Sequence, residues 1–266
     1  MKQLFLLSII ALTLFSCSKD DSVLPNDENC QLTFYGVART LPTAYNEIYN
    51  YTHYKDSIVG TYQYEADSRK IKYVFNDNEN TIYTETREIS ANTLVSYGTY
   101  YLDEQGLIDS FIRRNGSTDV INYRGIITRN ANNQVVREIS SYITYGHDRR
   151  FFYDENGDYS YGIEIGQGTS TYNDSIVYTL DMTKPNNGSP EYMLDDLNGK
   201  TSAHHVTRKV SIDRATLVVR QERRYTISPL DADGNLTFVK YEFENWPTDT
   251  FEADYSYDRT YGYSCQ

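Results

Sequence analysis

Hydrophobic and polar residues alternate along most of this chain, and the alternation is clearest near its middle. The aromatic segment Phe151–Tyr153 runs into Asp-Glu-Asn-Gly, after which apolar residues occupy positions 159, 161, 163 and 165. Successive side chains of a strand point to opposite faces, and Asn-Gly tolerates the positive φ of a tight turn. The pattern predicts a β-hairpin around residues 154–157, with the four apolar residues on one face of its second strand.

The same turn chemistry recurs along the chain. Similar segments begin at residues 103, 130 and 154, which are 27 and 24 residues apart, and Asp231–Asn235 is a later copy. Each interval has the length of two strands with their connections. No stretch of twelve residues has helical periodicity. We therefore predict an all-β fold, an antiparallel β-meander of repeated hairpins curled into an open or closed barrel-like sheet, with a long loop over the Pro-, Asn- and Gly-rich residues 183–201.

The first thirty residues predict export. Lys2 precedes an apolar run over Leu4–Phe15, and Ser16-Cys17 closes it. This resembles a lipoprotein signal peptide, which implies that residues 1–16 are removed and that Cys17 becomes an acylated, palmitate-bearing first residue. The alternatives are an ordinary secretory peptide or a short membrane helix, but twelve residues are too few to span a bilayer.

The segment after Cys17 predicts a destination. Ser18–Asp21 contains a lysine followed by two acids, and this resembles the surface-export signal of Bacteroidetes lipoproteins. The resemblance implies an outer-membrane, lipid-anchored and surface-exposed protein. A plain polar tether over residues 17–29 is the alternative, which leaves open whether the protein faces the periplasm. Residues 30–266 then form a single domain of β-hairpin repeats.

Two further cysteines, Cys30 and Cys265, remain once Cys17 carries lipid. Disulfides persist outside the cytoplasm, so we predict that these two form one, although two free thiols are the alternative. Such a bond would join the first residue of the domain to its penultimate residue. It therefore favours a curled or closed sheet over an open meander.

Composition narrows the possible partners. The formal net charge of −12 argues against nucleic acid, because phosphate binding needs a basic surface. The 27 tyrosines suit sheets that have one wet face and one half-buried face. A barrel embedded in lipid is not expected, since Arg220, Glu222 and Arg224 interrupt one face of a predicted strand while Gln221 and Arg223 interrupt the other.

Two family resemblances follow from these motifs. Tyr153–Gly157 and its relatives resemble the tyrosine-aspartate (YD) repeat, in which an aromatic residue, an acid and a glycine turn lie between strands. Leu180–Asn186, Leu197–Lys200 and Ser202–Thr207 resemble a Bacteroidetes lipoprotein domain of unknown function with a porin-like fold, with two histidines where that family has asparagines. The second resemblance covers most of residues 62–207 and implies no established activity.

Candidate chemistry is sparse. His204 and His205 are adjacent and would point to opposite faces of a strand, so they do not suit one metal ion. No catalytic motif is present, and we expect neither enzyme activity nor a cofactor. A weak calcium candidate combines the oxygen-bearing side chains of Asp231, Asp233, Asn235 and Glu242. An acidic hairpin turn is the favoured interpretation, since Leu236 stands where a calcium loop needs glycine and strands flank the segment in place of helices.

These features lead to a functional hypothesis and an alternative. The first is a lipid-anchored outer-membrane surface protein that binds or scaffolds an unknown envelope or extracellular ligand without catalysis. Its membrane contact would be the lipid on Cys17, and nucleic acid is excluded as a partner. The alternative is a periplasmic-type carrier that holds a hydrophobic ligand in a β pocket, and a hydrolase is a remote third possibility.

Overall fold

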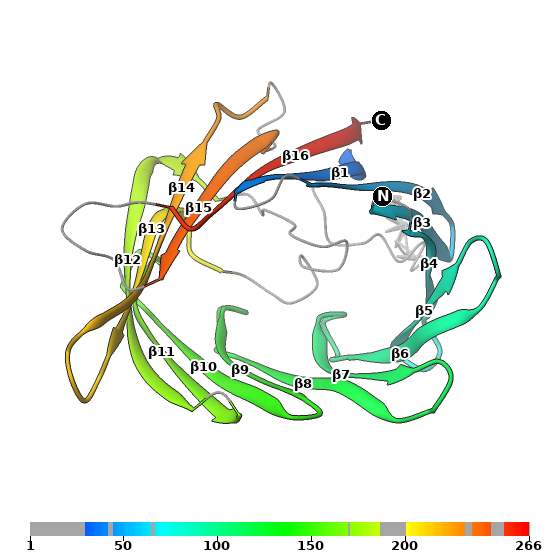
Figure 1. Ribbon diagram of the computed structural model, residues 1–266, viewed down its shortest axis with the longest axis horizontal. Coiled ribbons are helices and arrows are strands. Elements are labelled where there is room, and N and C mark those ends of the chain that lie inside the picture. The colour runs from blue at the N-terminus through cyan, green and yellow to red at the C-terminus, as the bar shows by residue number, and fades with distance from the viewer. Residues whose placement is uncertain are drawn as a thin grey trace, which may run out of the picture.

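The computed structural model describes residues 30–41, 45–64, 67–169, 171–186, 201–231, 236–245 and 253–265. These residues form sixteen strands (Figure 1). Their bounds are β1 Cys30–Leu41, β2 Tyr45–Tyr54, β3 Ser57–Tyr64, β4 Asp67–Asn76, β5 Thr81–Glu88, β6 Leu94–Leu102, β7 Ile108–Asn115, β8 Ile121–Arg129, β9 Val135–Tyr142, β10 Tyr145–Tyr153, β11 Tyr159–Gly168, β12 Tyr172–Pro185, β13 His204–Asp213, β14 Val219–Ile227, β15 Phe238–Asn245 and β16 Tyr255–Cys265.

The strands form a closed barrel in chain order. Each described strand is antiparallel to the one before it, and β1 pairs with β16 to close the circle. The closing pair runs from Cys30 opposite Cys265 to Leu41 opposite Ser256. The predicted all-β meander of hairpins is therefore confirmed. The prediction allowed an open or a closed barrel-like sheet, and the sheet is closed. Within the described residues, no helical segment has the length and apolar character of a membrane span.

The two ends of the barrel differ. Because β1 starts and β16 finishes on the same side, residues 30 and 265 lie at one end, which we call the terminal end. The turns that begin at residues 103, 130 and 154 lie there too, since each follows an even-numbered strand. The turns at 89–93, 116–120 and 214–218 lie at the opposite, far end. β12 continues to Pro185, so the loop predicted from residue 183 starts later, and residues 187–200 are outside the described part.

The three predicted turns share one hydrogen-bond pattern. In each, the side-chain oxygen of the first residue accepts bonds of 2.9–3.0 Å from the backbone N–H groups two and four residues later, as at Asp103, Asn130 and Asp154. The fourth residue has positive φ, at 78° for Gly106, 61° for Asn133 and 82° for Gly157. Asp, Asn and Gly are the residues that permit this geometry, so local chemistry alone specifies the repeat. The later copy, at residues 231–235, lies mostly outside the described residues.

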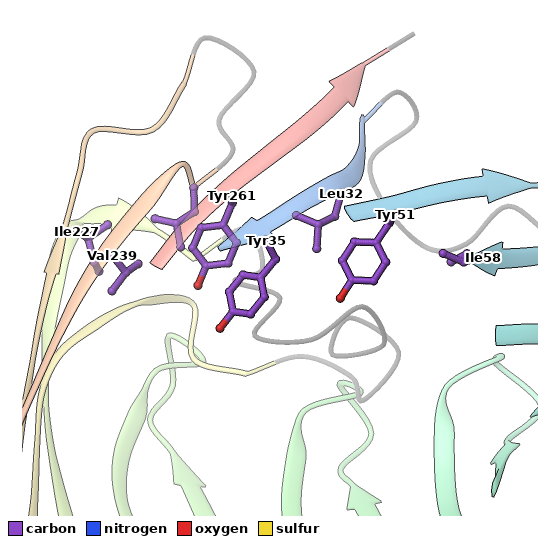
Figure 2. Close-up of a cluster of buried hydrophobic side chains, with 8 residues drawn as sticks. Leu32, Tyr35, Tyr51, Ile58, Ile227, Val239 and Tyr261 are labelled. Atoms are coloured by element: carbon purple, nitrogen blue, oxygen red, sulfur yellow. The ribbon is translucent and has the colours of Figure 1, made fainter. Parts of the chain in front are cut away.

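Apolar side chains on the inner wall form the core. Tyr35, Tyr51 and Tyr261 point into the barrel (Figure 2), and together with neighbouring aliphatic residues they make one buried cluster. A second cluster consists of Ile82, Ile108, Ile127 and Val135. Ile108 and Val135 each lie five positions after the first residue of a repeated turn, so the strand that follows the turn starts with a side chain in the core. Both clusters gather toward the terminal end.

The pairing register identifies the remaining inward residues, because residues directly opposite each other share a face. Direct pairs lead from Ile82 to Tyr100, then Phe111, Gly125, Ser140, His147 and Gly166. On β10 and β11 the inner wall therefore carries His147, Arg149, Gly162, Glu164 and Gly166. The residues between them face outward.

This register corrects the predicted apolar face of β11. A register shift between Phe152 and Tyr153 places Tyr153 opposite Tyr159 but Phe152 opposite Tyr161. Tyr159 consequently packs inside, with its ring centroid 4.7 Å from that of Tyr178, whereas Tyr161 is 45% exposed on the outer wall. Residues 163 and 165 share the outer face with Tyr161. Strict alternation had placed all four together, and the bulge breaks it.

Candidate functional site

The inner wall of β9–β13 holds a network of charged side chains. Glu138, Arg149 and Glu164 are direct partners on successive strands, so their side chains lie side by side. Arg149 bridges the two carboxylates, with nitrogen–oxygen distances of 3.4 Å to Glu138 and 3.2 Å to Glu164. Lys209 approaches Glu164 at 3.5 Å, and the Tyr172 hydroxyl donates to it at 3.0 Å. Three neighbouring strands, β10, β12 and β13, thus supply partners to one carboxylate on β11.

Burial and charge pairing set the protonation of this network. Burial alone would raise the pKa of Glu164, but Lys209, Arg149 and Tyr172 together lower it to about 2. Burial lowers the pKa of Lys209 to about 8, with Arg223 adding to the effect and Glu164 opposing it. Because each charge here has a neighbour of opposite sign, the network fills the wall with paired polar groups. Beside this network, Ser140 Oγ lies 2.5 Å from His147 Nε2, and Glu138 Oε1 lies 3.8 Å from that same nitrogen, whereas a catalytic triad places the hydroxyl and the carboxylate on opposite nitrogens of the imidazole.

An aromatic ladder lines the neighbouring part of the inner wall. It crosses β6–β10 through Tyr100, Phe111, Tyr123, Tyr142 and Tyr145, with successive ring centroids 5.6, 4.8, 4.2 and 4.5 Å apart. At the far end of the barrel Tyr142 and Tyr145 are 39% and 40% exposed. Cross-strand aromatic pairs of this kind stabilise a sheet, which accounts for much of the tyrosine content.

The two adjacent histidines lie in different surroundings. His204 Nδ1 lies 2.7 Å from Asp158 Oδ2, while the Ser202 hydroxyl donates to Asp158 Oδ1 at 2.9 Å. The carboxylate therefore stands between the hydroxyl and the imidazole, unlike a catalytic triad, in which the imidazole stands between the other two. His205 is buried, and burial lowers its pKa. Among the described residues, no three His, Cys, Asp or Glu side chains gather as a metal site would require.

The other sequence-predicted site residues are only partly described. Cys17 lies outside the described residues, and so do Asp233 and Asn235 of the calcium candidate. Glu242 lies on the outer wall of β15, where Lys240 Nζ donates to it at 2.9 Å. The calcium site therefore stays a prediction. Cys30 and Cys265 are backbone partners in the closing strand pair, while their side chains lie outside the described part.

The outer wall carries ladders of alternating charge. Asp148 accepts bonds from Arg137 at 2.8–2.9 Å and from Arg150 at 3.0 Å, and these arginines lower its pKa to about 2. The same arrangement recurs at Glu222, which accepts bonds of 2.7–2.8 Å from Arg224 on its own strand and from Arg208 on the preceding strand. Both ladders lie in the middle of their strands. The sequence had indicated charges on both faces at residues 220–224, and both faces carry them.

Comparison with known proteins adds a fold-level relationship. No protein-family model matches the chain, and no curated protein sequence matches it. Among solved structures, a porin-like protein from Bacteroides uniformis is similar, with a TM-score of 0.56 and 10% sequence identity. The match covers 88% of this chain and 96% of the other. At this identity the similarity concerns the fold, so the chain shares the closed antiparallel barrel of a porin-like protein from Bacteroides, as the second sequence resemblance implied.

Proposed function

We propose that this is a lipid-anchored outer-membrane protein whose barrel stands in water beside the bilayer, where it binds or scaffolds a partner without catalysis. The observation that carries the proposal is the charged outer wall. A barrel in lipid needs an apolar outer band about 25 Å tall. Here Arg137, Arg150, Arg208 and Arg224 occupy mid-strand outer positions around β9–β14.

The energetic cost of lipid contact would be large. One arginine at the bilayer midplane costs about 2–4 kcal/mol on the lipid face of a barrel. Four such residues would cost on the order of 10 kcal/mol, which is comparable to the whole stability of a typical domain. In water the same arginines remain solvated and hold Asp148 and Glu222 in ordered pairs. The outer wall therefore fits an aqueous setting.

The lipid on Cys17 would then orient the barrel. Residues 17–29 number thirteen, and thirteen extended residues reach at most about 45 Å. They join β1 at the terminal end of the barrel. That end would face the membrane, and the far end, with Tyr142 and Tyr145, would be presented outward.

Exchange of the signal segment tests this arrangement. Residues 1–17 are replaced by a cleavable secretory signal, so that the exported chain begins at Ser18. We expect the exchanged protein in the soluble fraction and the native protein in the membrane fraction. If the exchanged protein remained in membranes after an alkaline wash, the barrel itself would be embedded and the proposal would be wrong.

Surface display needs a separate measurement. Protease added to intact cells should digest the native protein, while a periplasmic control protein survives. Protection in intact cells but digestion after lysis would place the barrel on the periplasmic face. That result would not contradict the proposal that the barrel is exposed to water.

The cysteine pair belongs to the same proposal. Paired residues of an antiparallel ladder have Cα atoms about 4.5–5.5 Å apart, within the range of about 4.4–6.8 Å that a disulfide spans. Cys30 and Cys265 are such a pair. Alkylation of the unfolded, unreduced protein should label neither residue, and mass spectrometry would detect labelling of both if they were free thiols.

The carrier alternative has less support. A hydrophobic ligand needs an apolar lining, whereas the inner wall of β9–β13 presents Glu138, Arg149, Glu164 and Lys209. Many of the apolar side chains that do face inward pack against one another in the two core clusters.

A further inference from the structure

A groove of about 500 Å³ lies on the outer wall over β4, β5 and β6. These three strands are neighbours in the barrel (Figure 1). Its volume falls in the range of about 300–1,000 Å³ that is usual for ligand sites. Its lining includes Lys72, Asn76, Tyr83, Glu85 and Tyr101, which all face away from the barrel interior. The groove is therefore separate from the inner-wall network and from both core clusters.

Two tyrosine rings in the groove are free to accept a flat partner. Tyr83 is opposite Thr99 and Tyr101 is opposite Thr81, so the two tyrosines are diagonal neighbours, about 7–8 Å apart. They are 39% and 42% exposed. Among the described residues neither ring stacks on another aromatic ring. By contrast, Tyr161, on the outer wall of β11, lies 4.1 Å from the Phe152 ring in parallel.

The polar side chains of the groove also have unused bonding capacity. Within the described part of the chain, the side chains of Lys72, Asn76 and Thr99 make no hydrogen bond or ion pair with protein atoms. By contrast, Lys240 on the outer wall of β15 is engaged with Glu242 at 2.9 Å. The groove thus combines exposed aromatic faces with unpaired donors and acceptors.

The charges in the groove indicate which ligand fits. The lining contains Lys72 and two carboxylates, Glu79 and Glu85, and Glu85 is paired with Arg87 at 3.3 Å. The groove has no excess of positive charge, so it does not favour a phosphate, a carboxylate or another anion. A sugar ring has an apolar face, which packs on an aromatic ring, and a rim of hydroxyl groups, which exchange hydrogen bonds with polar side chains. We propose that this groove binds a neutral saccharide.

The inference rests on the proposed binding role and gives it a ligand class. If the groove bound no saccharide, the proposal of a water-exposed barrel would be unaffected, because the fractionation experiment does not involve the groove. The two proposals can therefore fail separately.

Titration of the detergent-solubilised native chain with neutral disaccharides tests the inference. Maltose, cellobiose and diacetylchitobiose serve as probes, and digalacturonate serves as an acidic comparison. Saturation-transfer NMR should show contact between sugar C–H groups and tyrosine rings for at least one neutral probe. If none binds, or if the acidic sugar binds more tightly, the inference is wrong.

Substitutions then locate the site. Tyr83→Ala and Tyr101→Ala should each weaken binding about tenfold. Tyr54→Ala is the matched control, because Tyr54 is 58% exposed at the end of β2 and lies outside the groove. Thr99→Val replaces a hydroxyl with a methyl group of similar size and should weaken binding severalfold even if an alanine variant folds poorly. Unchanged affinity in folded Tyr83 and Thr99 variants would overturn the assignment.

Discussion

The carboxylate of Glu164 should contribute a large, pH-dependent share of the stability of the barrel. Its side chain is 12% exposed and interacts with Arg149, Lys209 and Tyr172. The pKa falls from an ordinary value of 4.5 to about 2 in the folded protein. Each tenfold change in proton binding corresponds to about 1.4 kcal/mol, so the ionised group contributes about 3 kcal/mol. Because the folded pKa is the lower one, this contribution is present above about pH 4.5 and is lost as the pH falls toward about 2.

Urea unfolding of the native protein and of Glu164→Gln tests this value. At about pH 7 the variant should be less stable by about 3 kcal/mol, since it leaves Arg149 and Lys209 without their shared carboxylate. Near pH 2 the two proteins should converge, because protonated glutamate resembles glutamine. Glu104→Gln, an exposed carboxylate in a turn, should match the native protein throughout. A difference that is small at neutral pH, or that persists undiminished in acid, would refute the reasoning.

Three further predictions concern stability. Ile82 has no exposed surface, and Ile82→Ala should cost about 2–5 kcal/mol in urea unfolding, whereas Ile126→Ala, at a position 53% exposed, should cost less than about 0.5 kcal/mol. Equal losses would contradict the assigned faces. Asp154→Ala removes an acceptor of two backbone hydrogen bonds and should cost about 1–2 kcal/mol, while Asp154→Asn should retain most of the stability in the same assay. Burial raises the pKa of Tyr153 to about 12, so the stability that its neutral hydroxyl contributes should be lost as the pH rises from about 10 to 12. Tyr153→Phe cannot ionise and should lose less stability than the native protein over this pH range. If the stability of the variant fell as steeply, the prediction would be wrong.

The turns were predictable because their chemistry is local. Asp103 and Asp154 supply a side-chain acceptor, and Gly106 and Gly157 supply positive φ three residues later. These requirements are satisfied within five residues and can be read without knowledge of the fold. The meander followed from them, since each turn reverses the chain between neighbouring strands.

The faces and the charge network were not predictable in the same way. Register shifts reverse the alternation, and the one beside Phe152 displaced Tyr159 from the face of its neighbours. Arg149, Glu164 and Lys209 belong to three strands, and Lys209 is 45 positions beyond Glu164. One signal was available: Glu164 stands between Gly162 and Gly166, small residues that leave space on a crowded inner wall.

Closure of the barrel depended on one non-local pairing. The cysteines at residues 30 and 265 indicated that the first and last strands meet, and β1 pairs with β16. Nothing in the hairpin pattern specifies how many strands complete the circle. The aqueous setting of the barrel, the lipid on Cys17 and the bond between the two cysteines remain predictions.

The seam between β1 and β16 makes the strand order circular. In the described barrel every other strand pair is consecutive in the chain, so the ring of neighbours has no preferred starting point. A circular permutant can be made by joining the ends near residues 30 and 265 and opening the chain in the hairpin around Ser117. It would have the same set of strand pairs. Such a circular permutant would also move the attachment point of a tether from one mouth of the barrel to the other, and so present the opposite mouth to the surroundings.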